Sequence, residues 1–418
     1  MDMLRKLLIA NSLFISILSN AQIKKDLQQC EQLFLKNNFS LIAAQYNIDA
    51  NKALVIQAKI WDNPYLSMEL NGNNPQNAKF FDIGKSGQKA ASIQQLILLG
   101  GKRRNQIDLA KSNQKVAQLS FEDLLRNLKF ELRKSYYSIY FNNDKISALT
   151  VQANNLDTLV KAYSVQSQKG NVPIKDYLRL QSLLLDLKNE KMELVKDNIE
   201  QQANLNILLS DSSEIQPSLN ATFFEKYVST NNIKLSDIEK FAFVGRPDYT
   251  LSTQNVIASE TSVRLQKSMR VPDLTLGSSW DQHGGAFNNQ VNLTIGLPLS
   301  LWNKNQGNIK YAESLNAQAI ANQQSEAVQL KSEVTVAFKK WIEAKNNYNQ
   351  IAVTNFDSYQ SVYQSIVENF RKGNISILEF TDFLESYNQM RSHYNELKKN
   401  LVLSAETLNT AANTELFK

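Results

Sequence analysis

Residues 272–297 read PDLTLGSSWDQHGGAFNNQVNLTIGL, and this stretch decides the fold. Apolar and polar residues alternate on both sides of a turn at Gly284-Gly285, which is the period of a β-strand. The pattern predicts an antiparallel hairpin with strands of about ten residues, long enough to cross a bilayer when tilted. The alternating apolar positions are Leu274, Leu276, Trp280, Val291, Leu293, Ile295 and Leu297.

An earlier window, residues 61–101, holds a matching pattern. Leu66, Met68 and Leu70 alternate with polar residues, and a partner strand around residues 89–99 alternates less cleanly. One such hairpin could be half buried in a soluble protein, and two make that alternative weaker. Four strands cannot close a barrel, because bacterial membrane barrels begin at about eight strands and an open edge cannot face lipid. Closure therefore requires at least two chains, and three would supply twelve strands.

Long stretches without glycine or proline follow each window. They span residues 102–169 and 308–372 and are rich in Leu, Ala, Lys, Gln and Glu, which predicts helices. A helix of this length extends roughly 100 Å, as in coiled coils or extended helical barrels. Both stretches end at Lys-Gly-Asn, at 169–171 and 372–374, after which a second helical stretch follows.

The two halves of the chain repeat this order of helix, strand pair, long helix, glycine turn and helix. Three pairs of matching segments lie 208, 202 and 203 residues apart, which predicts a tandem duplication. The expected organisation is mostly helical with a membrane β part. Its segments are an N-terminal helical segment (22–60), a first hairpin (61–101), a first helical hairpin (102–210), an inter-repeat segment (211–247), a helix (248–271), a second hairpin (272–303) and a second helical hairpin with the C-terminal segment (304–418).

The N-terminal residues 1–21 have the pattern of a secretory signal peptide. Arg5 and Lys6 precede an apolar stretch at residues 7–18, and Ser19-Asn20-Ala21 supplies a small-x-small cleavage site. We expect cleavage after Ala21 and export of the chain. A buried N-terminal helix is the alternative.

The composition argues against catalysis and against nucleic acid. The chain has one cysteine, Cys30, and two histidines, His283 and His393, which are expected on a loop and on a helix face. The chain therefore has too few cysteines and histidines for a typical zinc site or for a cysteine or serine nucleophile with a histidine base. The net charge of +6 includes no basic block, so no nucleic-acid partner is expected. We predict no catalytic residue, no metal ligand and no cofactor.

At this point the sequence resembles the TolC family of outer-membrane efflux ducts, over nearly the whole chain after the signal peptide. The resemblance rests on the duplicated plan, on the two glycine turns and on Arg246-Pro247-Asp248 at the start of the second half. Two further segments resemble the cation-efflux branch, of the cobalt–zinc–cadmium and copper–silver type. They are LLGGKR at 98–103 and LPLSLWNKNQGN at 297–308.

The resemblance implies a homotrimer with a twelve-stranded β-barrel in the outer-membrane lipid, continued into the periplasm by a long α-helical barrel. Its implied partners are a periplasmic adaptor, or membrane fusion protein, and an inner-membrane pump of the resistance-nodulation-division type. The implied function is passive conduction of substrate, of metal cations for this branch. A drug-efflux duct and a type I secretion duct remain alternatives within the class.

The resemblance also implies site residues at the periplasmic tip. The turns Gly170-Asn171 and Gly373-Asn374 would form the tip and contact the adaptor. Four residues would line the pore constriction: Glu379 and Asp382 after the second turn, Asp176 after the first, and Phe370. A basic residue expected two positions after the second turn glycine is replaced by Ile375, and Arg179 occupies the second acidic position of the first repeat.

Blander interpretations exist for each feature. Glu379 and Asp382 could be ordinary solvated acids on a helix face. Trp61, Trp280 and Trp302 lie near strand ends, as in an interfacial aromatic belt, or they simply pack. A soluble periplasmic coiled-coil scaffold or adaptor is the alternative function of another class, and a hydrolytic enzyme is the weakest.

Overall fold

The computed structural model describes residues 23–75, 78–85, 87–220, 222–229, 233–352 and 356–417. The predicted signal peptide at 1–21 lies outside these residues. The chain divides into two compact units, which we describe separately. The strand unit comprises residues 43–122 and 247–328, and the helical unit comprises residues up to 42, 123–246 and 329–418. The longest helices contribute to both units.

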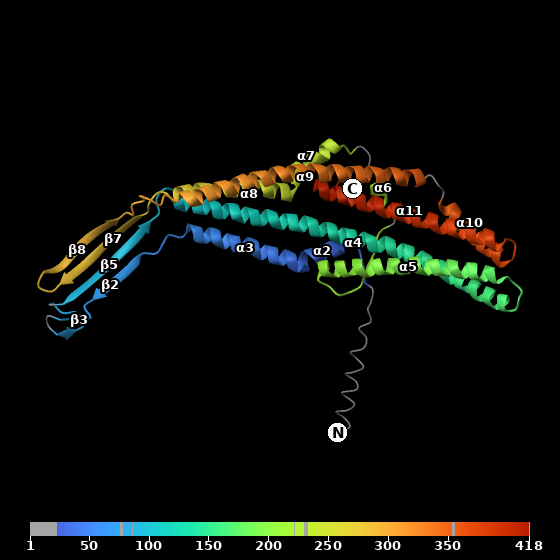
Figure 1. Cartoon of the computed structure of the whole chain (residues 1–418), viewed down its shortest axis with the longest axis horizontal. Helices are drawn as coiled ribbons and strands as arrows, with labels where there is room; N and C mark the ends of the chain where they lie inside the picture. The colour runs from blue at the N-terminus through green and yellow to red at the C-terminus, as the bar shows by residue number, and fades with distance from the viewer. Residues whose placement is uncertain are drawn as a thin grey trace, which may run out of the picture. The chain divides into compact units, whose positions relative to one another are not determined.

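The strand unit is built around one antiparallel sheet in the order β2-β5-β7-β8, whose strands lie side by side in Figure 1. Pairing of β5 with β7, from Gln88↔His283 to Ile97↔Leu274, joins the two predicted hairpins into a single sheet. Strands β2 and β8 form its edges. The strands are β2 (Tyr65–Leu70), β5 (Gln88–Ile97), β7 (Leu274–His283) and β8 (Phe287–Gly296), with a small β3 (Asn73–Asn74) and β4 (Lys79–Phe80) pair between β2 and β5.

Helices lead into and out of the sheet. Helix α3 (Phe39–Lys59) precedes β2, and α8 (Pro247–Ser268) precedes β7. The sheet is followed by α4 (Lys102–Gln168) after β5 and by α9 (Gln306–Ala352) after β8. None of the helices described is both long enough and apolar enough to cross a membrane.

The two motifs of the cation-efflux branch are strand-to-helix junctions. Gly100 has a φ of +66°, and a Cβ there would lie 2.7 Å from the Val271 side chain, so glycine is required. The next residues start α4, where Lys102 is buried and contacts Asp273 at 2.7 Å. In the second motif Asn305, at φ +58°, donates from Nδ2 to the Gln266 carbonyl at 2.8 Å.

The helical unit holds the remainder of α4 and α9, with six further helices described and a two-stranded parallel pair. Where the sequence predicts one helix over 308–372, the structure describes α9 and α10 with three undescribed residues between them. The added elements are β1 (Ile23–Lys25), α2 (Leu27–Asn37), α5 (Ile174–Leu209), β6 (Ile215–Pro217), α6 (Glu225–Ser229), α7 (Leu235–Gly245), α10 (Phe356–Arg371) and α11 (Ile377–Ala412).

An apolar core joins α4, α5, α10 and α11. Leu156, Leu180, Phe380 and Tyr387 are each at most 1% exposed within it. The core residues recur at three- and four-residue steps along each helix. Each helix therefore turns one apolar stripe toward the other helices. Burial of this stripe holds the helical hairpins together, since full burial of a large apolar side chain contributes about 1.5–3 kcal/mol.

A buried ionic network ties the chain termini to the long helices. Arg133 on α4 donates to Glu31, Glu406 and Glu415 at 2.7, 2.9 and 2.8 Å. The Tyr227 hydroxyl donates to the other oxygen of Glu406 at 2.6 Å. Glu406 is 2% exposed, so its charge depends on these partners. One guanidinium thus connects α2, α4, α11 and the residues after α11.

Candidate functional site

The register of the sheet separates an apolar face from a polar one. Leu66 pairs with Ile93, Ile93 with Ser278 and Ser278 with Leu293, so these side chains share one face. Most of the apolar side chains of this face are exposed to solvent in the isolated chain, with Leu293 at 85% exposure. The set comprises Leu66, Met68, Leu70, Ala91, Ile93, Ile97, Leu274, Leu276, Trp280, Val291, Leu293 and Ile295.

The opposite face is polar. The hydroxyls of Ser67 and Ser92 hydrogen-bond across it at 2.8 Å, which shows that neighbouring strands turn the same kind of side chain toward it. Lys89 is the one Lys or Arg in the four strands, and it belongs to the apolar face, where its ammonium lies 5.9 Å from the Trp280 ring centre. The polar face comprises Tyr65, Ser67, Glu69, Gln88, Ala90, Ser92, Gln94, Leu96, Thr275, Gly277, Ser279, Asp281, His283, Gln290, Asn292, Thr294 and Gly296.

Two carboxylates of the polar face lie on one row across the sheet. Glu69 pairs with Ala90, Ala90 with Asp281, and Asp281 with Gln290. Two strand spacings separate the carboxylates, roughly 10 Å. One carboxylate oxygen of Asp281, Oδ1, is buried without a hydrogen-bond partner. The row therefore puts two acidic side chains on the polar face, which sequence reasoning missed because the pairing of β5 with β7 brings them together. We call this row the carboxylate band.

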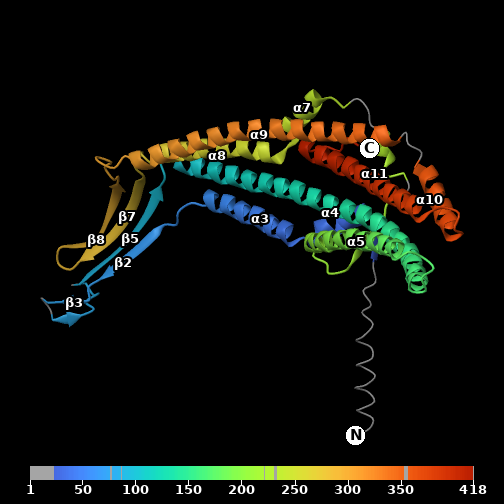
Figure 2. The ribbon, with the colours of Figure 1, turned by 45° about the vertical axis from the view of Figure 1, so that its right-hand side comes forward.

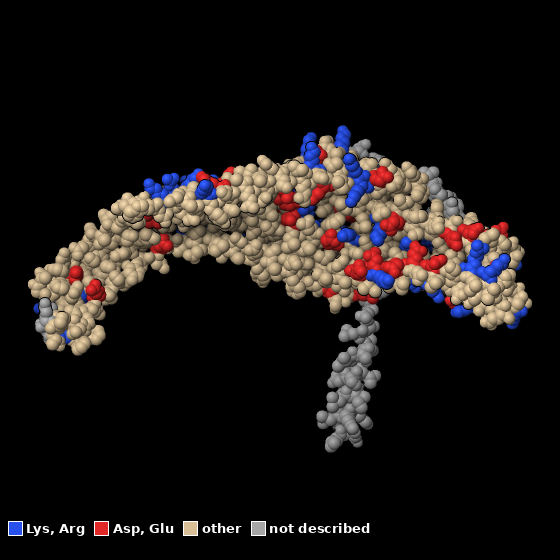
Figure 3. Space-filling model, in the orientation of Figure 1, with Lys and Arg blue, Asp and Glu red and all other residues tan. Residues whose placement is uncertain are grey.

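The edges of the sheet carry free backbone hydrogen-bonding groups. Strands β2 and β8 each have one partner in the sheet, and the strand directions alternate from β2 to β8. Antiparallel pairing of β8 with β2 of another copy would continue this alternation. An apolar face of this kind suits lipid only if such edges are paired. Figure 3 shows few charged side chains over the strands and many over the helices.

The two predicted tip turns have the same geometry, which explains the repeated Lys-Gly-Asn. Gly170 and Gly373 have φ of +74° and +75°, the left-handed conformation that ends a helix. The backbone N–H of Asn171 donates to the Gln166 carbonyl at 2.9 Å, and that of Asn374 donates to the Asn369 carbonyl at 2.9 Å. Each asparagine amide also donates to the side chain of the same partner, at 2.7 and 3.1 Å.

Three of the predicted constriction acids remain accessible. Glu379 and Asp382 are exposed and lie three residues apart on α11. They share a face that is turned away from the buried Phe380. The Glu379 carboxylate accepts from the Ser376 backbone N–H at 2.8 Å, which lowers its pKa below the ordinary value and caps α11. Asp176, in the first turn of α5, is half-buried and helps to raise the pKa of Tyr163, mainly a result of burial.

The fourth predicted residue, Phe370, packs against other aromatic side chains of the chain. Its ring is 5% exposed and stacks on the Phe380 ring with centres 4.1 Å apart. It also stacks on Tyr163 at 5.7 Å. Phe370 therefore packs in the core of the single chain, because its helix turns it toward α4 and α11, and its place at a pore constriction stays a prediction.

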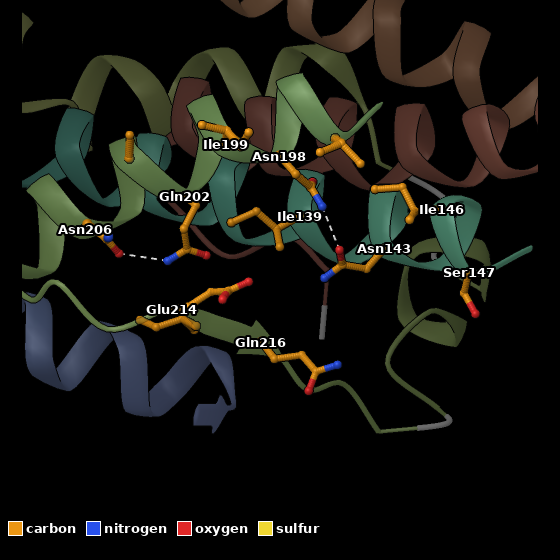
Figure 4. A pocket seen from close by; sticks show the side chains of 13 residues that line it. Ile139, Asn143, Ile146, Ser147, Asn198, Ile199, Gln202, Asn206, Glu214 and Gln216 are labelled. Carbon is orange, nitrogen blue, oxygen red and sulfur yellow. Dashed lines mark hydrogen bonds between the residues drawn. The ribbon is translucent and has the colours of Figure 1, made fainter. Parts of the chain in front are cut away.

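A cavity of about 760 Å³ lies between α4, α5 and β6 (Figure 4). Its wall combines isoleucines such as Ile139, Ile146 and Ile199 with amides. Asn198 donates to Asn143 at 2.6 Å, and the amides of Gln202 and Asn206 hydrogen-bond at 2.8 Å. Ser147 and Glu214 also line this cavity, and no histidine or cysteine does.

Candidate metal ligands do not gather among the described residues. No three side chains of His, Cys, Asp or Glu come close enough there to hold an ion. His283 is exposed at the end of β7, and its ring lies 5.9 Å from that of Phe287. Burial raises the pKa of the Cys30 thiol to about 11, so this cysteine is protonated at neutral pH.

Comparison with known proteins finds similar proteins both by sequence and by structure. The cobalt-zinc-cadmium resistance protein CzcC of Cupriavidus metallidurans is 19% identical over 366 residues, covering 86% of this chain and 82% of CzcC. The crystal structure of CusC has a TM-score of 0.73 at 16% identity and covers 95% of both chains. That of the Campylobacter jejuni CmeC outer membrane channel has a TM-score of 0.75 at 16% identity, covering 94% of this chain and 86% of CmeC. The model of the outer membrane efflux proteins matches residues 31–210 and 242–414, and this chain belongs to that family.

Proposed function

We propose that three copies of this protein form the exit duct of a tripartite efflux system and conduct metal cations out of the cell. As an outer membrane efflux protein the chain is a channel of that membrane, and it conducts substrate rather than transforming it. The trimer, the cation substrate and the partners are the proposal.

The separation of the sheet into two faces with two open edges carries the proposal. Each chain supplies four strands, so three chains supply twelve, above the minimum of about eight for a closed barrel. Pairing of β8 with β2 of the next copy would leave no edge exposed to lipid. The apolar face would then contact lipid, and the polar face would line a water-filled lumen.

Fixed charge supports a cation as the substrate. Glu69 and Asp281 would give the lumen six carboxylates in one band, and no Lys or Arg of the four strands lies on that face. Glu379 and Asp382 would add six more at the periplasmic end. Rings of carboxylates favour cations in pores. The similarity to a cobalt-zinc-cadmium resistance protein favours metal cations in particular.

The turns at Gly170-Asn171 and Gly373-Asn374 are the proposed contact with a periplasmic adaptor, which would couple the duct to an inner-membrane pump of the resistance-nodulation-division type. Their matching geometry supports this role, because a trimer would present six similar turns to a partner. Asn171 and Asn374 are exposed, so the partner could reach them.

Two measurements test the proposal. Native mass spectrometry of the protein extracted from outer membranes should give a trimer. Reversal potentials of the trimer in planar bilayers under a salt gradient should show preference for cations. A monomer in the soluble periplasmic fraction would favour the scaffold alternative, whereas a trimer without cation preference would favour drug efflux or type I secretion.

A further inference from the structure

We propose that the loop between β2 and β5 is a binding site for a phosphate-bearing glycolipid of the outer leaflet. The structure describes residues 71–75, 78–85 and 87 of this loop, which include β3 and β4 and lie at the end of the sheet remote from α4 in Figures 1 and 2. The inference rests on the proposed function, in which the apolar face of this sheet meets lipid.

The loop presents large apolar side chains to solvent. Phe80, Phe81 and Ile83 are 78%, 71% and 50% exposed, within four consecutive residues. Exposed apolar side chains in such density are unusual unless they meet a membrane or a partner. Phe81 also has a φ of +52°, a conformation that is uncommon for a bulky residue and that persists only when the surroundings fix it.

The surroundings of Phe81 do fix it. Asn74 donates to Asp82 at 2.9 Å, and both side chains are buried, at 8% and 6% exposure. The Phe81 backbone N–H donates to the Gly72 carbonyl at 3.1 Å, which extends the small β3–β4 pair. These two hydrogen bonds thus hold the part of the loop that carries the exposed rings. They also keep Phe81 in its uncommon backbone conformation.

The loop contacts the apolar face of the sheet. Gln282 belongs to that face, because it pairs with Lys89, which in turn pairs with Leu70. Its side-chain amide donates to the Gly84 carbonyl at 3.2 Å. Gly84 follows directly after Ile83, so the exposed apolar residues continue the surface that begins with Leu70 and Trp280.

Positive charge surrounds these apolar residues. Lys79 and Lys85 are exposed in the loop, and Lys89 is half-buried at the loop end of the apolar face. The one acid of the described loop residues, Asp82, is buried against Asn74. Lysines beside apolar and aromatic side chains match a lipid with phosphates next to acyl chains. A second copy of this cationic loop would meet repulsion, which favours lipid as the occupant.

The test uses the full-length trimer in mild detergent, titrated with bisphosphorylated lipid A and followed by native mass spectrometry. Replacement K79Q/K85Q/K89Q should weaken binding at least tenfold, since each lysine near an anionic lipid contributes roughly a fivefold effect. The control K310Q/K331Q/K339Q makes the same charge change at exposed positions of α9 and should bind as the parent does. Lipid A without phosphates should not distinguish the parent from either variant.

Equal affinity of the parent and the loop variant would overturn the site. Displacement of lipid A by millimolar inorganic phosphate would also overturn it, because a free anion would then be the ligand. Dissociation of the trimer by F80S would show that a second copy covers the loop. Conductance of the loop variant, measured in bilayers, should equal that of the parent, so loss of lipid binding alone leaves the proposed function intact.

Discussion

The ammonium group of Lys102 lies 2.7 Å from Asp273 Oδ1, and this pair joins the two repeats where the sheet meets the helices. The same oxygen accepts from the Leu99 backbone N–H at 3.0 Å. Lys102 starts α4 of the first repeat, and Asp273 directly precedes β7 of the second. The side chain of Lys102 is 5% exposed, so its charge depends on this carboxylate.

Removal of that carboxylate should destabilise the protein. We expect Asp273→Ala to lower the free energy of unfolding by about 3 kcal/mol, because it leaves a buried charge and a backbone donor without a partner. Asp273→Asn should cost less, since its amide oxygen still accepts. Denaturant unfolding measures the difference. Glu313→Ala is the control, because its ion pair with Lys267 is about half exposed and should contribute less than about 1 kcal/mol.

The carboxylate band of the polar face should set ion preference. Glu69→Gln with Asp281→Asn removes the two negative charges, and we expect a severalfold lower cation-to-anion permeability ratio in bilayers, because fixed charge no longer concentrates cations. Lys89→Gln is the matched control, since Lys89 lies near the same level of the sheet on the opposite face. An unchanged reversal potential in the double variant would remove the band from the lumen.

Glu379 and Asp382 should govern block by multivalent cations. Glu379→Gln with Asp382→Asn should weaken block added from the periplasmic side by about tenfold or more, because the charges that concentrate the cation are lost. Single-channel recording measures the blocking concentration. Glu396→Gln changes an exposed charge of α11 about four turns beyond Asp382 and should have little effect. If both variants behaved alike, these acids would be ordinary solvated residues.

The turn at Gly373 should resist substitution for conformational reasons alone. A Cβ there meets no atom within 4 Å, but φ is +75°, so Gly373→Ala should destabilise the helical hairpin by about 1 kcal/mol. Gly307 also has open space around its Cβ position, and it lies in the first turn of α9 without a positive φ. Gly307→Ala should therefore stabilise by up to about 1 kcal/mol. Thermal unfolding of both variants compares the signs.

The ion pair between Arg133 and Glu415, which holds the residues after α11, should weaken in acid. The side-chain hydrogen bond from Arg133 lowers the pKa of Glu415, so the folded state binds its proton less tightly than the unfolded state. Its contribution is complete above the ordinary pKa of a glutamate and is lost as the pH falls through the lowered value. The protection of the backbone amides of residues 413–417 against hydrogen exchange, relative to the intrinsic exchange rate at each pH, should fall over that window. In the Glu415→Gln variant these amides should already be as weakly protected at neutral pH as they are in the parent in acid. Acid should then reduce their protection no further.

Much of this architecture is visible in local sequence patterns. The alternation at 291–297 predicts β8, and the Lys-Gly-Asn pairs predict helix ends because only glycine adopts a left-handed conformation without strain. The stacking of Phe370 on Phe380 and Tyr163 could not be predicted from the sequence. Its position before the turn gives no information on the rotation of its helix against α4 and α11, which packing decides.

By itself the sequence determined the elements, their duplication and the paired glycine turns, because these depend on interactions within a few residues of each other. Only the tertiary structure decided that β5 pairs with β7. That pairing joins segments almost 200 residues apart in the chain. Its register puts Glu69 and Asp281 on one row and Lys89 on the opposite face, and a shift by one residue would exchange the two faces of a strand. The candidate lumen charge is therefore a property of the assembled sheet.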